Sequence, residues 1–154
     1  MMQYEALGAL DLFIPRLGVD TSIVGVPISE RGWDVTWLWN QVGYLEGTAF
    51  PTWTGNTALS AHNVLPNGLP GPFARLRQLR WGDEVVIRAS GLDYIYSVRE
   101  VILTHPDDSS ALKHEEYDWV TLITCAGFDD ESGEYLNRSV VRAILLSVKP
   151  NLHH

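Results

Sequence analysis

Apolar and polar residues alternate along most of this chain in short runs, and turn-forming residues separate the runs. A period of two predicts β-strands, because successive side chains of a strand point to opposite faces. Runs of this kind predict strands at Thr21–Val26, Thr57–Ala61, Glu84–Ala89, Tyr94–Leu103, Trp119–Cys125 and Asn137–Leu146. Many short strands with almost no helical periodicity predict an all-β protein, folded as a closed or nearly closed antiparallel β-barrel.

Three of these strands carry further signals: one predicts a β-bulge, and the last two predict a β-hairpin. In residues 94–103 the apolar pattern changes sides near Glu100, which indicates a β-bulge or a bend. The last two strands flank an acidic, glycine-containing turn and therefore predict a β-hairpin. The residues of this turn are Asp129, Asp130, Ser132 and Gly133.

The start of the chain is less regular. Residues 1–11 have weak helical character, so we expect a leader segment there, followed by a single folded domain at residues 12–149 and a tail at residues 150–154. Residues 12–19 read as a short edge strand that Pro15 interrupts, because proline cannot donate to a ladder.

The remaining segments predict an aromatic strand, loops and short helices. Three of the alternating residues at Trp33, Val35, Trp37 and Trp39 are tryptophans, which we expect to pack on the core instead of forming an exposed platform. Residues 43–49 and 63–72 are predicted as loops. Residues 73–79 have apolar side chains at helical spacing, and Ser109 or Ser110 is a candidate N-cap of a second short helix.

Composition narrows the function classes. A chain of 154 residues is long enough to form one core. The net charge of -8 and the presence of only two lysines argue against nucleic-acid binding, which needs a basic surface. No apolar run approaches the ~18 residues of a membrane-spanning helix, and no signal-peptide pattern opens the chain. The single cysteine cannot form an internal disulfide, so it gives no evidence for an oxidising compartment.

The residues best suited to chemistry lie at the ends of predicted strands. Cys125 ends one strand of the hairpin and Arg138 opens the next. Side chains at strand ends are held by the sheet yet reach solvent, and such positions often carry function. An isolated cysteine at a strand end is otherwise more often a small buried hydrophobe.

Three motifs occur in a fixed order along the chain. They are Gly-Asn-Thr-Ala-Leu-Ser-Ala-His at residues 55–62, Thr-Leu-Ile-Thr-Cys at residues 121–125 and Arg-Ser-Val-Val-Arg-Ala at residues 138–143. This ordered set resembles the signature of sortases, the cysteine transpeptidases of bacterial cell surfaces, and the similarity extends from about residue 14 to about residue 148. The one departure is Ser60-Ala61, where Ala-Gly is usual before the histidine.

The resemblance implies a sortase-like barrel of about eight strands and a catalytic set of three residues. Cys125 is then the nucleophile, His62 the acid and base, and Arg138 the residue that stabilises the oxyanion or the substrate. No resident cofactor or metal is expected, although calcium modulates some sortases. The implied substrate groove includes the loop at residues 104–116. The substrate-binding residues implied within the motifs are Ser60, Ala61, Thr121, Ile123 and Thr124.

The resemblance also implies partners and a location. The substrate is a secreted protein with a C-terminal Leu-Pro-x-Thr-Gly-like sorting signal, cut between Thr and Gly. The acceptor is an amine of a cell-wall peptide or of a pilin lysine. The full-length form is expected to be tethered to the membrane, with this soluble domain on the extracellular face. The absence of an Asp-Pro-aromatic lid motif near the N-terminus favours cell-wall anchoring over pilin polymerisation.

Each of these assignments has a rival. His105 competes with His62, because it precedes the cysteine strand in the chain, and Arg142 competes with Arg138, because both fall on the same strand face. The acidic turn at residues 129–131 is a candidate cation site, but a solvated turn is the preferred interpretation. An inactive barrel that only binds surface peptides is the alternative from another function class. An L,D-transpeptidase places His and Gly directly before its cysteine, and a papain-like enzyme places its cysteine on a helix before the histidine; neither pattern is present.

Overall fold

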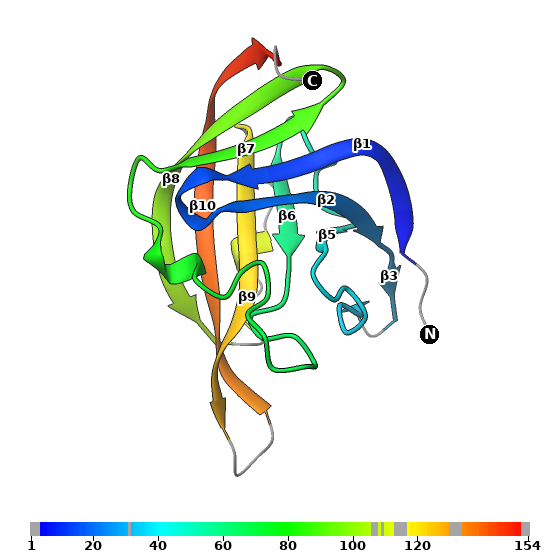
Figure 1. Cartoon of the computed structure of the whole chain (residues 1–154), viewed down its shortest axis with the longest axis vertical. Helices are drawn as coiled ribbons and strands as arrows, with labels where there is room; N and C mark the ends of the chain where they lie inside the picture. Colours follow the sequence, from blue (N-terminus) through cyan, green and yellow to red (C-terminus); the bar gives the residue numbers. More distant parts are fainter. Residues whose placement is uncertain are drawn as a thin grey trace.

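The computed structural model describes residues 4–30, 32–105, 108, 110–112, 117–129 and 134–151, with the backbone alone described at residues 112, 125–129 and 134–136. In this part of the chain eight strands close into one barrel, in the order β1-β2-β5-β6-β9-β10-β8-β7 (Figure 1). The barrel strands are β1 (Glu5–Ile14), β2 (Val19–Val26), β5 (Val42–Leu45), β6 (Asn56–Ser60), β7 (Glu84–Ala89), β8 (Leu92–Thr104), β9 (Trp119–Asp129) and β10 (Glu134–Pro150). A separate two-stranded sheet and three 3-10 turns complete the described elements: β3 (Ile28–Ser29), β4 (Gly32–Trp33), η1 (Pro15–Leu17), η2 (Leu76–Gln78) and η3 (Ser110–Leu112).

The prediction of an all-β, closed barrel is confirmed. Leu12 of β1 pairs with Thr21 of β2 on one side and with Ile87 of β7 on the other, so the first strand closes the sheet. Most neighbouring strands are antiparallel, but two pairs, β2 with β5 and β6 with β9, are parallel. Because β6 and β9 run parallel, the end of β6 at Ser60 lies level with Ile123, and β9 continues beyond it to Asp129.

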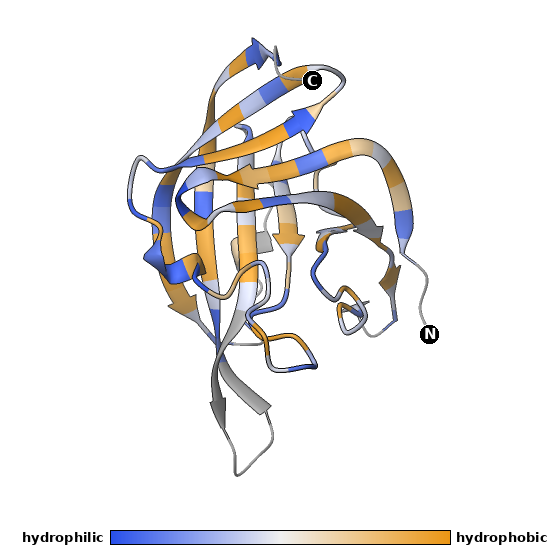
Figure 2. Ribbon diagram, in the orientation of Figure 1, coloured by the Kyte–Doolittle hydropathy of each residue, from blue (hydrophilic) through white to orange (hydrophobic). Residues whose placement is uncertain are grey.

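The barrel interior is filled by inward-facing apolar side chains, as the alternation of hydrophobic and hydrophilic residues along the strands shows (Figure 2). Phe73, Leu76 and Leu79, from the segment around η2, are almost fully buried in the same interior cluster. Their spacing of three residues therefore predicted a helical turn correctly. Burial of this surface stabilises the fold by about 25 cal/mol per Å² of apolar area.

The N-terminal prediction was wrong for residues 5–11. These residues belong to β1, and Glu5 already pairs with Gly25 of β2. Pairing with β2, and from Leu10 onward also with β7, overrides the weak helical preference of the segment. Pro15 does not interrupt an edge strand: it begins η1 directly after β1, and Gly18 then turns the chain in the left-handed region, with φ of 65°.

The tryptophan prediction was wrong for two of the three residues at issue. Only Trp33 of the alternating segment is in a strand, β4, and the chain then turns. Trp37 and Trp39 are 44% and 51% exposed, whereas Leu38 between them is fully buried. The alternating residues after Trp33 therefore form a loop and not a strand, and Leu38 is the fully buried side chain of this loop.

The loop predicted at residues 43–49 is partly wrong, whereas the β-bulge predicted near Glu100 is present. Residues 42–45 form the buried strand β5 and not the predicted loop. Gly43 is needed there for close packing, because a Cβ at this position would lie 2.6 Å from a methyl carbon of Val26. The predicted irregularity near Glu100 is confirmed: Arg142 pairs with Glu100 and Ala143 with Val98, which leaves one extra residue in β8.

Of the two candidate N-caps of the second short helix, Ser110 is instead the first residue of η3, and Ser109 lies outside the described residues. The carboxylate of Asp108 accepts a hydrogen bond of 2.9 Å from the Ser110 backbone N–H. The predicted hairpin of β9 and β10 is present, with Asp129 paired to Glu134 and residues 130–133 outside the described part. Searched over its described residues, the chain contains no helix long and apolar enough to cross a membrane.

Candidate active site

The cysteine and the arginine predicted as catalytic lie opposite each other in the barrel wall. The prediction that they stand at strand ends was wrong, because β9 continues past Cys125 to Asp129 and β10 begins at Glu134, before Arg138. β9 and β10 are antiparallel neighbours, and Arg138 is the direct ladder partner of Cys125. Directly opposed residues of such a pair have Cα atoms about 4.5–5.5 Å apart. The sheet therefore fixes these two positions relative to each other without any loop between them.

His62 lies level with Cys125 on the other side of β9, because it follows the neighbouring strand β6. β6 runs parallel to β9, with Ser60 paired to Ile123. Beyond that pair the contact continues, because the Thr124 hydroxyl donates to the Ala61 carbonyl at 2.7 Å and the Ala61 N–H donates to the Ile123 carbonyl at 3.4 Å. Extending this register by two residues sets His62 level with Cys125.

The backbone and the ring of His62 are both held in place. The Phe73 N–H donates to the His62 carbonyl at 3.1 Å, and a Cβ on Gly71 would lie 2.2 Å from that carbonyl oxygen, so only glycine permits this approach. The His62 ring is half-buried, and its Nε2 lies 3.1 Å from the Thr36 carbonyl oxygen. Thr36 belongs to the loop that follows β4.

The rival histidine lies farther from the cysteine strand. His105 follows Thr104, the last residue of β8, and Thr104 pairs with Arg138 across β10. Two strand spacings, about 10 Å, separate β8 from β9, whereas β6 is a direct neighbour of β9. The strand order therefore favours His62 over His105.

The rival arginine has local structural partners. Arg142 lies 3.4 Å from the carboxylate of Glu100, and its guanidinium stacks 4.5 Å from the centre of the Trp119 ring. Its side chain is 16% exposed. These contacts give Arg142 a structural role in the barrel wall, as one half of an ion pair and of a stacking contact.

A second apolar cluster lies on the outer side of this wall. Ala58, Ile123 and Val140 are buried there, although they come from three strands of the barrel and are absent from its interior cluster. We call this the outer cluster; its buried members are Val26, Leu38, Leu45, Ala58, Ile123 and Val140. Leu38 of the loop after β4 and the partly buried Ala111 of η3 belong to it, so loops cover an outward face of the barrel.

Asn56 links this wall to the segment before β9. The Thr121 hydroxyl donates to Asn56 Oδ1 at 2.6 Å, and the Asn56 side-chain amide donates to the Ala111 carbonyl at 2.6 Å. The sequence contained this residue only as part of a motif and suggested no role for it. Its position shows that it ties η3 to β6 and β9.

The predicted substrate-binding residues differ in accessibility. Thr121 is fully buried, and Thr124 is 5% exposed with its hydroxyl donated to Ala61. Both threonine hydroxyls thus donate to groups within the barrel wall, and their contact with substrate stays a prediction. Ala61 and Ile123 are also buried, at 4% and 5% exposure, and Ser60 is half-buried. Since Ala61 fits within the wall, alanine in place of the usual glycine is accommodated.

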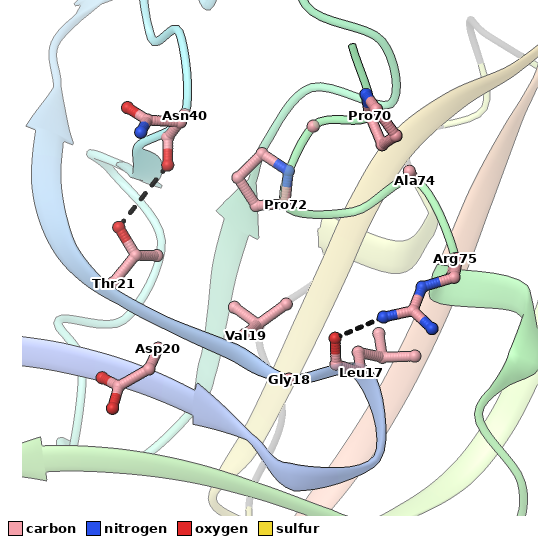
Figure 3. A pocket seen from close by; sticks show the side chains of 11 residues that line it. Leu17, Gly18, Val19, Asp20, Thr21, Asn40, Pro70, Pro72, Ala74 and Arg75 are labelled. Carbon is pink, nitrogen blue, oxygen red and sulfur yellow. Dashed lines mark hydrogen bonds between the residues drawn. The ribbon is translucent and has the colours of Figure 1, made fainter.

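A cavity of about 330 Å³ lies beside this region, between the η1 turn, the start of β2 and residues 70–75 (Figure 3). Arg75 donates to the Leu17 carbonyl at 2.6 Å on one side, and Thr21 donates to the Asn40 carbonyl at 3.5 Å on the other. Neither His62 nor Arg138 lines it. In the part of the chain open to description, no group of three or more metal-ligating side chains is arranged around a common point.

Known proteins share both the sequence and the fold. Residues 12–146 match the Sortase domain family. Sortase A of Bacillus anthracis is 32% identical over 82 residues, which are 53% of this chain and 38% of that protein. The chain thus spans little more than a third of the length of that relative.

Two solved structures extend the similarity. A sortase D5 transpeptidase of Clostridium perfringens has a TM-score of 0.71 and 27% identity, covering 90% of this chain and 78% of that one. A lid mutant of sortase A of Corynebacterium diphtheriae has a TM-score of 0.77 and 25% identity, covering 98% of this chain and 75% of that one. The closed barrel, the register of β6, β9 and β10 and the match over residues 12–146 lead to one conclusion: the chain belongs to the sortase family.

Proposed function

We propose that this chain is a cysteine transpeptidase that cuts a Leu-Pro-x-Thr-Gly-like sorting signal between Thr and Gly and transfers the acyl part to an amine. The observation that carries the proposal is the register of three adjacent strands. Arg138 pairs with Cys125, and β6 delivers His62 beside the same strand.

The chemistry follows from these three residue types. Cys125, as thiolate, attacks the threonine carbonyl carbon, and Arg138 donates hydrogen bonds to the resulting oxyanion. The carbon–nitrogen bond to glycine then breaks, and the leaving amine takes a proton from His62. The product is a thioacyl enzyme and a free C-terminal peptide.

The second half of the reaction releases the enzyme. An acceptor amine attacks the thioester carbon and transfers a proton to His62, and the Cys125 thiolate departs. The acceptor is a cell-wall peptide amine or a pilin lysine. One structural relative is described as a pilus-related sortase C of Group B Streptococcus, which supports a surface-protein substrate for this chain as well. Such a substrate places the reaction at the cell surface.

The groove for the signal is expected beside β9, where Ser60 is half-exposed and the loop around η3 borders the wall. The buried Thr121 and Thr124 support this groove from below. Ile123, as part of the outer cluster, sets its apolar floor.

A peptide screen tests the proposal. The chain is incubated with peptides carrying different sorting signals, with and without triglycine or a lysine peptide, and the products are identified by mass spectrometry. We expect cleavage after threonine and an amide product when an amine is present, and neither with Cys125→Ala. An inactive barrel, the alternative function, would bind peptides and leave them intact.

A further inference from the structure

Tyr4 contacts the loop that carries Thr36. Its hydroxyl donates to the Asp34 carbonyl at 2.8 Å and accepts from the Trp37 N–H at 3.0 Å. Tyr4 itself is half-buried against the outer cluster. The contact joins residues 30 or more positions apart, so it fixes the loop to the start of the chain.

One peptide unit connects Tyr4 to His62. The Thr36 carbonyl and the Trp37 N–H belong to the same planar group, and in a trans group they point in opposite directions. The Trp37 N–H donates to Tyr4 Oη, while the Thr36 carbonyl lies 3.1 Å from His62 Nε2. Tyr4 and His62 therefore occupy the two ends of one peptide dipole.

This arrangement affects both the direction and the strength of the contact with His62. Hydrogen bonds in a chain polarise one another, so donation by the Trp37 N–H makes the Thr36 carbonyl a better acceptor. Burial raises the pKa of Tyr4 above its ordinary value, against the opposing effect of the Trp37 hydrogen bond. The hydroxyl consequently stays protonated and can both donate and accept.

Contacts within the loop hold the same geometry. The Thr36 N–H donates to the Asp34 carboxylate at 3.0 Å, and the Leu38 N–H donates to the Val35 carbonyl at 3.3 Å. Leu38 is fully buried in the outer cluster. The loop is thus held by an internal turn, by the buried Leu38 and, from outside, by hydrogen bonds that include the two made by Tyr4.

We propose that Tyr4 is a positioning residue for His62, acting through the Thr36 carbonyl. A neutral imidazole donates from one nitrogen only, so donation by Nε2 to Thr36 leaves Nδ1 as the acceptor. Tyr4 in this way selects the Nε2–H tautomer and presents Nδ1 for proton transfer. The catalytic consequence rests on the proposed function, whereas the tautomer is a property of the folded chain alone.

The tautomer is measured by ¹⁵N NMR of histidine-labelled protein above the pKa of the ring. We expect His62 to hold mainly the Nε2–H form, and Tyr4→Phe to shift it toward a mixture. Tyr44→Phe is the matched control, because Tyr44 also donates to a backbone carbonyl, that of Thr48 at 2.6 Å, without contacting the loop. An unchanged tautomer in Tyr4→Phe would overturn the inference.

Kinetics give a second readout. Losing the two hydrogen bonds by which Tyr4 holds the loop beside His62 predicts a fall in kcat of about three- to tenfold for Tyr4→Phe, with KM within about twofold and an altered pH profile. Tyr44→Phe should retain wild-type values. Equal losses in both variants would show a general structural effect and overturn the positioning role. Wild-type protein that shows the expected tautomer but cleaves no sorting signal would refute the proposed function and leave the positioning role standing.

Discussion

The inside of the barrel and its outer face over β6, β9 and β10 are made by the same strands, but they differ in chemistry. The interior cluster is large and almost wholly apolar. The outer cluster is smaller, is covered by loops, and is bordered by polar residues, among them His62, Asn56 and Arg138.

This difference separates stability from function. Inward side chains contribute to stability only, because they fill the closed interior of the barrel and exclude water. Outward residues near the ends of β6 and β9 bury part of their surface and also position polar groups. A substitution inside is therefore expected to lower the free energy of unfolding, whereas one outside is expected to alter catalysis as well.

Among the comparisons of paired residues, the largest effect is expected at the two histidines. His62→Ala should lower the rate of acylation by about 10²- to 10⁴-fold, through loss of general acid–base catalysis. His105→Ala, two strands from the cysteine strand, should retain nearly full activity. Single-turnover cleavage of a sorting-signal peptide compares the two variants. A greater loss at His105 would show that the strand order misassigns the histidine.

Two leucines of equal burial test the two faces directly. Leu122 of β9 lies in the interior cluster and Leu38 in the outer cluster, and both are fully buried. Each change to alanine should lower the free energy of unfolding by about 2–5 kcal/mol. Only Leu38→Ala should also lower kcat/KM of the folded protein, because it loosens the loop that carries Thr36. Denaturant titration and kinetics below the transition separate the two effects, and equal kinetics in both variants would contradict the division.

The two arginines of β10 test geometry against charge. Arg138→Lys should lower kcat/KM at least about tenfold, because lysine keeps the charge and loses the planar donor fork. Arg142→Lys should leave kcat/KM nearly unchanged, since Arg142 pairs with Glu100 and stacks on Trp119. Transpeptidation assays on both variants measure this. Equal, mild losses would mean that the site needs positive charge only.

The strands were predictable because apolar and polar residues alternate along a strand that has one buried face. The bounds of β7 followed from that alternation, and the turn around Phe73 followed from apolar side chains at helical spacing. The motif resemblance predicted His62, Cys125 and Arg138, which the strand register now brings to one level of the wall.

The loop positions could not be predicted in the same way. Trp37 was predicted to be buried and is exposed, whereas Leu38 beside it is fully buried. The reason is that Leu38 packs in the outer cluster and Trp37 does not. The Tyr4 hydroxyl bonds backbone groups of the distant loop. Every residue type carries such backbone groups, so the sequence does not indicate the contact. Parallel pairing of β6 with β9 likewise depends on the path of the connecting chain.

The smallest effect is expected at Asp34. Hydrogen bonds from the side chain and the backbone of Thr36 hold the pKa of this carboxyl below its ordinary value. A lowered folded-state pKa stabilises the loop at pH above the unfolded value of about 3.9, and this contribution is lost as the pH falls through the folded pKa. Asp34→Asn should therefore reduce stability by less than about 1 kcal/mol at neutral pH and remove that acid dependence. Urea titrations from pH 3 to pH 7 compare it with the wild type, and an identical pH slope would contradict the turn's role.

The mass of the intact protein tests the central claim most directly. The chain is mixed with a sorting-signal peptide without an amine and is measured within the first turnovers. We predict an added mass equal to the peptide up to its threonine, carried by Cys125, removed by triglycine and absent from Cys125→Ala. Peptide cleavage by Cys125→Ala, or turnover by the wild type with no adduct even when quenched in acid, would contradict a thioacyl mechanism at this site.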